Sequence, residues 1–476
     1  MGTITRVAKN TSLVSTEIIL VNLLSFGFAV YVTRALGVME FGKFAFAKAF
    51  MEMLVVWADL GLAKLLIREV ARNREDISSY LPDFAAIKLL FSILTVAMIA
   101  LLMRILGYEP EVIRIVYILG GAYLVHSFTG IPVSVFQGYE RMGLGSSLSV
   151  FRSLLLILFG VTVLTGGYGL KGLCWSIFAA NAIHALSAFF FLLNGFARIK
   201  FCFHPAVWWS IAKESFSFGV GSVFVRIYAR IDSVMLSKMI GMTVVGLYNA
   251  AYNIVIALMF LPGALSQALF PVTSRYFETD PDKAKNIFER SFKYSVLIGF
   301  PAATGIAFLS DKIILMMYGT SFNEAAAALR ILIWTLAFSF ATAMLGNLLN
   351  SANQQIRTTY NMMICTAVNI GLNLILIPLY GFLGASAATV LTDVSLVTLS
   401  YLSVRKYVYA PRIAMPLIKA VLGSLVMGAA LYFIRDGSLF LSISLGALVY
   451  AVMLLIVKVF DREDWNILQK MLFLKS

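Results

Sequence analysis

The chain has 476 residues, of which 60% are hydrophobic and only 13% are charged. A soluble globular domain carries about 25% charged residues, so this composition excludes a soluble protein and indicates an integral membrane protein. The formal net charge is +14. A positive charge of this size could indicate a nucleic-acid partner. The positions of the basic residues along the chain decide whether it does.

Apolar runs of at least about 18 residues, long enough to cross a bilayer, follow one another along the whole chain. They lie at 13–33, 41–62, 84–106, 112–136, 146–166, 170–193, 213–237, 243–268, 292–317, 325–349, 358–378, 383–404, 414–434 and 438–460. The sequence therefore predicts an all-α membrane protein with about fourteen transmembrane helices.

Basic residues gather in every second loop. They follow the second, sixth, eighth and twelfth runs and close the chain, whereas the intervening loops hold few of them. This is the positive-inside pattern, and it predicts a multi-pass protein of the cell (plasma or inner) membrane with both termini in the cytoplasm. The first residues lack the features of a cleaved signal peptide. The surplus charge is thus a topology signal, and we expect no nucleic-acid partner.

A glycine pattern near the start of the chain returns about 200 residues later. Gly37 and Gly42 have counterparts at Gly241 and Gly246, and a second set, Gly169 with Gly172, returns as Gly381 with Gly384. Two sets in the same order predict a duplicated unit, the architecture of secondary transporters. We expect a six-helix lobe at 1–196, a basic linker near 194–209, a second six-helix lobe at 197–410, and a terminal helix pair at 411–476.

Polar residues in the seventh and second runs predict a binding site. Spacings of three and four place Arg226 and Arg230 on one stripe of the seventh helix, with Arg226 roughly 16 Å from its outer end. Lys48, Glu52 and Asp59 form a stripe on the second helix. Counting from the outer ends sets Lys48 level with Arg230 and Glu52 level with Arg226.

Three cations facing one carboxylate inside a membrane predict a hydrated, positively charged pocket suited to a phosphate or pyrophosphate. The repeat adds the first and eighth helices to its walls, with Asn22, Tyr252 and Asn253 as further lining residues. An alternative is that Glu52 forms internal ion pairs that only hold the helices together. Three intramembrane acids, Glu17, Asp59 and Asp393, are candidates for coupling a cation such as H⁺ or Na⁺, with interfacial or capping roles as the alternative.

Several other chemistries are not supported by the sequence. The three histidines and three cysteines are dispersed and show no metal-ligand or disulfide spacing, so we expect no metal and no cofactor. Residues Gly37 to Lys43 match the start of a phosphate-binding loop, but Phe44 stands where Ser or Thr is required. An ATP site is not expected.

Five stretches carry a resemblance to a known family over essentially the whole chain. They are Arg34-Ala-Leu-Gly37 with Phe41-Gly42, Phe44-Ala-Phe-Ala47, Arg230-Ile-Asp232 through Gly241, Gly246-Leu-Tyr-Asn-Ala-Ala-Tyr252, and Tyr380-Gly381 with Gly384-Ala385. The chain resembles the polysaccharide and O-antigen flippases of the superfamily that also contains MATE drug exporters and lipid II flippases. The resemblance implies a MATE-like two-lobe transporter, and no enzyme. It would act as a monomer and move a polyprenyl-(pyro)phosphate-linked oligosaccharide from the cytoplasmic to the outer leaflet by alternating access.

Three other functions were weighed against this one. A lipid II flippase is a close relative, but the first helix lacks the arginine that this branch suggests. A cation-coupled MATE-type exporter of small molecules would place acids, not a cationic cluster, at its binding centre. A membrane glycosyltransferase would present a large outer loop with paired carboxylates, and the predicted outer loops are short.

Overall fold

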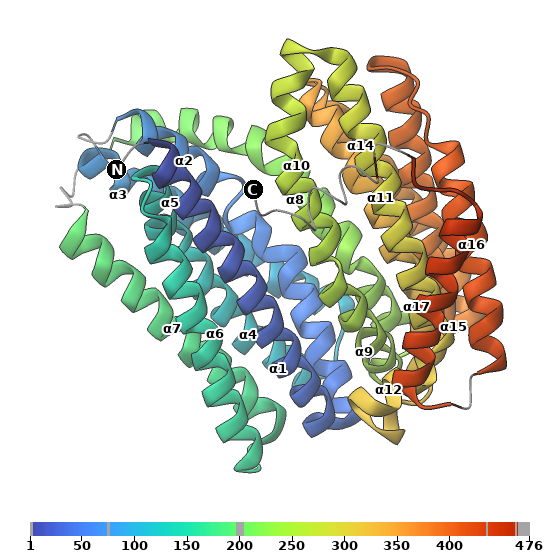
Figure 1. Ribbon diagram of the computed structural model, residues 1–476. Coiled ribbons are helices and arrows are strands. Elements are labelled where there is room, and N and C mark those ends of the chain that lie inside the picture. Colours follow the sequence, from blue (N-terminus) through green and yellow to red (C-terminus); the bar gives the residue numbers. More distant parts are fainter. Residues whose placement is uncertain (1–2, 74–76, 197–203, 435–436, 462–463, 465–476) are drawn as a thin grey trace. The chain divides into compact units, whose positions relative to one another are not determined.

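The computed structural model describes residues 3–73, 77–196, 204–434, 437–461 and 464 (Figure 1). Every regular element within these ranges is helical, and no β-strand is found in them. The chain divides into two compact units, Met1–Asn249 and Ala250–Ser476. Each unit is described by itself below.

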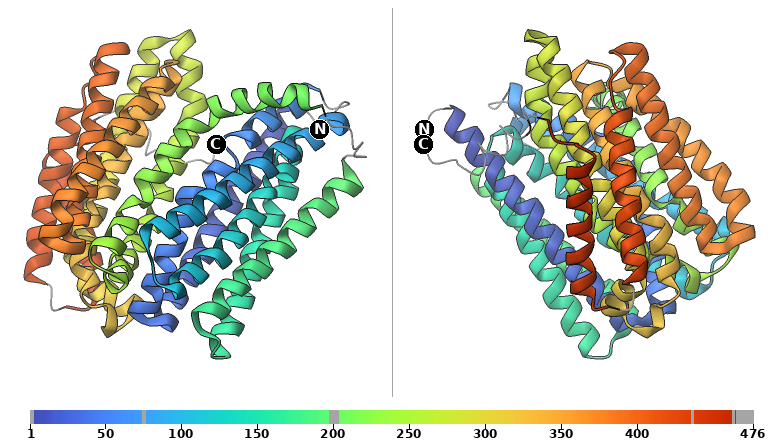
Figure 2. Two further views of the ribbon diagram at one scale, coloured as in Figure 1. Left: turned by 180° about the vertical axis from the view of Figure 1, so that it is seen from behind. Right: turned by 45° about the vertical axis from the view of Figure 1, so that its right-hand side comes forward.

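The first unit is a bundle in which α4 packs against α7, α7 against α6, and α6 against α1, with α8 along α1 (Figures 1 and 2). After α1, the chain continues through η1, which packs against α3, and α2, which packs against α5. Its helices are α1 (Thr3–Leu54), η1 (Val55–Ala58), α2 (Leu62–Arg72), α3 (Ile77–Leu106), α4 (Pro110–Phe128), α5 (Gly130–Gly138), α6 (Met142–Thr165), α7 (Gly169–Gly195) and α8 (Pro205–Met239), and α9 (Met242–Leu258) begins in it.

The second unit is organised around α11, which packs against α14, α16 and α10. The long helix α15 packs on the other side against α14 and α13, and α17 pairs with α16 (Figure 2). Its helices are α10 (Phe260–Thr279), α11 (Pro281–Phe308), α12 (Ser310–Tyr318), η2 (Thr320–Phe322), α13 (Ala325–Leu332), α14 (Trp334–Ser351), α15 (Gln355–Tyr407), α16 (Ala414–Phe433) and α17 (Leu439–Ile456).

Within the described residues, 10 helical segments are long and apolar enough to cross a membrane, or 11 if α11 and α12, which meet at a bend of 72°, form one span. The all-helical membrane architecture is thereby confirmed. The count of about fourteen stays a prediction. Two physical reasons account for the difference: α1 and α15 each continue through a non-helical glycine, Gly37 and Gly381, and so each covers two of the predicted runs. In addition, α8 is not among the apolar segments, because its charged residues lower its hydropathy.

The repeated glycines make a reciprocal contact. A Cβ atom on Gly42 would collide with the carbonyl of Met242, and one on Gly246 would collide with the carbonyl of Val38. Gly42 and Gly246 are counterparts in the predicted repeat, and so are Val38 and Met242. The contact of Gly42 with Met242 therefore has its counterpart in the contact of Gly246 with Val38. The reciprocal contact is consistent with the predicted repeat, which stays a prediction. Helices at this point approach so closely that only glycine fits.

The second set of repeated glycines also shares a backbone conformation. Gly169 and Gly381 both have positive φ, at 59° and 60°, a region that glycine enters without strain. The boundary between the compact units follows Asn249, whereas the predicted lobe boundary follows residue 196. The difference arises because α8 packs along α1 and α2. The two six-helix lobes and the terminal pair stay predictions, and both termini, Cys202 and much of the predicted linker lie outside the described residues.

Candidate functional site

Glu52 is the centre of a polar cluster inside the first unit. It lies near the end of α1 with 16% of its side chain exposed, and Arg230 Nε of α8, 14% exposed, is 2.6 Å from its Oε2. Lys48 Nζ, one turn earlier on α1, is 4.0 Å from Oε1. The hydroxyl of Tyr123 on α4 donates a hydrogen bond to the same oxygen at 3.4 Å. Three helices thus converge on one carboxylate.

The partner of Glu52 differs from the one predicted by counting along the helices. Counting sets Glu52 level with Arg226, but the ion pair is with Arg230, one turn further along α8. Antiparallel α1 and α8 are also fixed past the end of α1, where a Cβ on Gly61 would strike the backbone of Ser215 and Gly219. The close approach of α1 and α8 sets which of their residues lie level with each other. Counting residues from the helix ends does not predict where this close approach occurs.

Arg226 and Lys48 are the less tightly held cations of the cluster. Arg226 is exposed and within electrostatic range of Glu52, yet none of the described carboxylates lies within 4.0 Å of it. The side chain of Lys48 is 38% exposed, and its only ion pair in the described part of the chain is the 4.0 Å one with Glu52. Both groups can therefore accept an anion without first breaking a short ion pair.

A fourth cation, Arg152, belongs to the cluster and was missed in the sequence. It lies on α6, within electrostatic range of Lys48 and of the Tyr123 hydroxyl. Its Nε donates to Asn181 Oδ1 on α7 at 2.8 Å, and Asn181 Nδ2 donates to the carbonyl of Ala122 at 3.0 Å. The signal was available, because Arg152 lies within the predicted span 146–166 and an arginine inside a span indicates function.

The charges in this cluster do not balance. Lys48, Arg226 and Arg230 lie around the carboxylate of Glu52, and Arg152 adds a fourth cation within electrostatic range of Lys48. An arginine or lysine at the centre of a membrane helix costs about 2.5–3.5 kcal/mol on insertion scales, so an uncompensated excess is expensive unless a ligand or water meets it. Guanidinium groups bind phosphate through paired hydrogen bonds. The arrangement is therefore suited to binding a phosphorylated anion.

The predicted lining residues are not all found in this unit. Asn22 lies half-buried on α1, with no side-chain hydrogen bond among the described residues. Tyr252 and Asn253 lie on α9 beyond Asn249, in the second unit. Tyr252 is buried and Asn253 half-buried. Their place in the same site stays a prediction.

The three acids proposed for cation coupling have different surroundings. Ser146 of α6 donates a hydrogen bond to Glu17 at 2.7 Å. Asp59 forms an ion pair of 2.5 Å with Lys88 of α3, whose side chain is 2% exposed, so a lysine ammonium stands where a coupling cation would bind. Asp393 is buried within α15 of the second unit. No described group of three or more His, Cys, Asp or Glu side chains could hold a metal ion.

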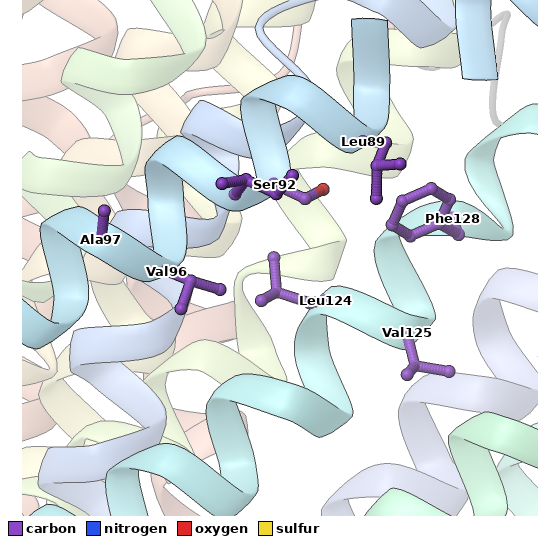
Figure 3. A pocket seen from close by; sticks show the side chains of 8 residues that line it. Leu89, Ser92, Val96, Ala97, Leu124, Val125 and Phe128 are labelled. Atoms are coloured by element: carbon purple, nitrogen blue, oxygen red, sulfur yellow. The ribbon is translucent and has the colours of Figure 1, made fainter. Parts of the chain in front are cut away.

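A separate groove of about 450 Å³ runs between α3 and α4 (Figure 3). Apart from the Ser92 hydroxyl, its walls are apolar and include Leu89, Val96, Leu124 and Phe128, and no charged side chain lines it. Burial of hydrocarbon is favoured on such a surface, whereas burial of an anion is not. The groove can accept an acyl or isoprenoid chain and is unsuited to a phosphate.

The helical architecture and the intramembrane cation cluster define a multi-pass membrane transporter. Residues 7–277, more than half of the chain, match the family described as "Polysaccharide biosynthesis protein", and residues 218–375 match the MatE family. The protein belongs to the polysaccharide biosynthesis protein family.

Relatives of known name agree with this assignment. The chain is 23% identical over 364 residues to the "Probable low-salt glycan biosynthesis flippase Agl15" of Haloferax volcanii, covering 76% of each chain. It is 26% identical over 377 residues to the "Probable flippase AglR" of the same organism, again covering 76% of each. Its fold is similar to that of the lipid II flippase MurJ in an inward closed conformation, with a TM-score of 0.77 and 16% identity, covering 92% of this chain and 97% of the other.

Proposed function

We propose that this protein is a flippase that moves a polyprenyl-(pyro)phosphate-linked oligosaccharide from the cytoplasmic to the outer leaflet, for polysaccharide or glycan export. The observation that carries the proposal is the excess of cations around Glu52 between membrane helices. Membership of the polysaccharide biosynthesis family and two relatives named as flippases add support. A lipid-linked sugar needs such a site, because its phosphate must leave water while its tail stays in the bilayer.

The first step is capture of the headgroup by the loosely held cations. The phosphate binds Arg226 and Lys48, which are not engaged in short ion pairs, and then competes with Glu52 for Arg230. The Glu52–Arg230 pair keeps the guanidinium in position until the anion arrives. Exchange of one anionic partner for another leaves the number of buried charge pairs almost constant, which lowers the barrier to transport. Alternating access then exposes the site to the other side.

The remaining features of the proposal concern the surroundings of the protein. The protein works as a monomer in the cell membrane, with both termini in the cytoplasm, and acts as a transporter rather than an enzyme. Asn22, Tyr252 and Asn253 contact the cargo, while Glu17 or Asp393 binds the coupling cation, H⁺ or Na⁺. The partners are thus the lipid-linked oligosaccharide and the membrane lipids.

Reconstitution into vesicles tests the proposal directly. Vesicles carry a fluorescent, short-chain, diphosphate-linked oligosaccharide, and a membrane-impermeant quencher reports how fast it changes leaflet. We expect the wild-type chain to accelerate the exchange, and Arg226→Ala to reduce the rate roughly tenfold or more, since it removes a charge-assisted phosphate contact. Arg104→Ala, an exposed arginine on α3, is the matched control and should transport normally. Exchange no faster than in protein-free vesicles would refute the proposal.

A cation-coupled MATE-type exporter of small molecules is the second candidate, and the match of residues 218–375 to the MatE family favours it. The two functions make opposite demands on the charged residues. Drug efflux that depends on Glu17 or Asp393 but is unaffected by Arg226→Ala would select the exporter. Glycolipid exchange that depends on Arg226 selects the flippase.

A further inference from the structure

Arg152 is held by a neutral amide, and no acid lies beside it in the described part of the chain. Its Nε is bound to Asn181 Oδ1 at 2.8 Å, and among the described residues no carboxylate lies within 4.0 Å of its guanidinium. The opposite edge of the guanidinium, with its two terminal nitrogens, makes no hydrogen bond in the described part of the chain. A guanidinium of this kind presents a preformed fork for two acceptor oxygens.

Asn181 positions this arginine and ties it to the bundle. Its amide nitrogen donates to the carbonyl of Ala122 on α4, and its amide oxygen accepts from Arg152 on α6. The side chain is 1% exposed. One residue of α7 thereby fixes an arginine of α6 relative to α4, and a fixed donor loses less entropy when it binds than a mobile one.

The other groups around Arg152 carry no compensating negative charge. His126 and His184 lie within electrostatic range of it, with their ring centroids 5.5 Å apart. Among the residues that the structure describes, neither nitrogen of the buried His184 ring has a hydrogen-bond partner. Tyr123 contributes a phenol hydroxyl, and Lys48 is a second cation. None of these groups supplies a counter-charge, so an anionic ligand can supply it.

We propose that Arg152, positioned by Asn181, forms a second anion subsite that makes the protein prefer a diphosphate-linked over a monophosphate-linked lipid. The inference rests on the proposed function and deepens it by naming the headgroup. A diester of one phosphate carries one negative charge, whereas a diphosphate diester carries two. One phosphate binds Arg226, Arg230 and Lys48, and the second binds the terminal nitrogens of Arg152. A monophosphate-linked lipid has no second phosphate for this contact.

Two probes with the same tail and sugar test this subsite: farnesyl-linked N-acetylglucosamine with either one or two phosphates, titrated against the purified full-length chain. We expect wild type to bind the diphosphate roughly tenfold more tightly, as one charge-assisted contact provides. Arg152→Gln should bring the ratio of the two affinities close to one while leaving monophosphate binding almost unchanged. Asn181→Ala should reduce the ratio in part. Arg104→Gln is the control and should retain the full ratio.

The ratio separates a binding role from a structural one, because damage to the fold weakens both probes alike. Equal weakening of both probes by Arg152→Gln would overturn the subsite. Equal binding of both probes by wild type, together with normal leaflet exchange, would overturn the subsite and leave the flippase proposal intact. Binding of neither probe by wild type would overturn the flippase proposal, and the subsite with it.

Discussion

The two units handle polar groups inside the membrane in different ways. The first unit places charges between its helices, with Arg230 on Glu52 and Lys88 on Asp59. In the described part of the second unit, the polar contacts between helices are mostly amide and hydroxyl pairs. Asn347 of α14 donates to the carbonyl of Ser266 of α10 at 2.7 Å, and Asn361 donates to Ser403 at 3.2 Å, between the two parts of α15 on either side of Gly381. Buried Asp393 and Asp464 are exceptions.

The difference in charge corresponds to a difference in role. Amides hold helices together at a small cost, since both partners are neutral. A charge removed from water costs several kcal/mol unless a partner of opposite sign meets it. The excess of cations around Glu52 therefore destabilises the fold and is not explained by stability alone. Among the described residues, such a cluster is found in the first unit only. We assign headgroup binding to the first unit on this ground, and a scaffolding role to the amides of the second.

The largest effect is expected from breaking the buried pair of Asp59 and Lys88. Asp59→Ala leaves the Lys88 ammonium, 2% exposed, without a counter-charge, which costs about 3–5 kcal/mol. Unfolding in detergent, followed by thermal or denaturant titration, measures the loss. The double variant Asp59→Leu with Lys88→Met is the control, because it removes both charges and should recover most of the stability.

The same pair tests whether Asp59 binds a coupling cation. If the pair is structural, the double variant transports with unchanged dependence on H⁺ and Na⁺. A double variant that is stable but has lost its dependence on a cation would contradict this interpretation and return Asp59 to the coupling role.

The second prediction concerns a charge cluster of the second unit centred on Asp464, which lies beyond the last predicted span. Burial acts to raise the pKa of the Asp464 carboxyl, but hydrogen bonds from Lys293 and Tyr294, the latter at 2.5 Å, outweigh it and lower the pKa below 3.8. The stabilisation is thus fully present above about pH 4 and is lost as the pH falls through the lowered value.

Asp464→Asn should therefore reduce the melting temperature by about 2 °C at pH 7, with allowance for screening by water. The gap between wild type and variant should close as the pH falls below about 4. Asp282→Asn, at a side chain 92% exposed, is the matched control and should change little at either pH. A gap that stays constant down to low pH would show that the carboxylate charge is not what stabilises this contact.

Hydropathy and the glycine pattern were sufficient to predict the helical membrane architecture, because span length and close packing depend on local sequence. The equivalence of Gly42 and Gly246 could be predicted, but their mutual contact could not, since a repeat carries no information on how its copies meet. Lys48 and Glu52 of one predicted stripe and Arg230 of the other lie close together in the structure, and their role in binding stays a prediction. The pairing of Glu52 with Arg226 was wrong by one turn.

Two parts of the polar interior were beyond the sequence for different reasons. Arg152 was visible as an arginine within a span, but its neighbours Asn181 and Tyr123 come from other helices, whose rotation the sequence does not specify. The predicted stripe placed Asp59 on the same helix as Lys48 and Glu52, but α1 ends at Leu54, and Asp59 follows η1 and pairs with Lys88 of α3. Such partners are set by tertiary packing, which periodicity along one helix does not include.

The smallest effect is expected in the amides of the second unit. Asn347→Leu removes the hydrogen bonds to Ser266 and replaces the amide by a side chain of similar size, so the loss should be about 0.6 kcal/mol, the mean for such bonds in membranes. Leaflet exchange of the fluorescent glycolipid should remain at the wild-type rate, because a neutral amide that bridges α14 and α10 does not meet the headgroup. Ser266→Ala is the matched partner variant, and the two changes together should cost little more than one alone. Normal stability combined with a severalfold loss of transport would place Asn347 on the cargo path, and would remove the distinction between a charged binding unit and a neutral scaffold.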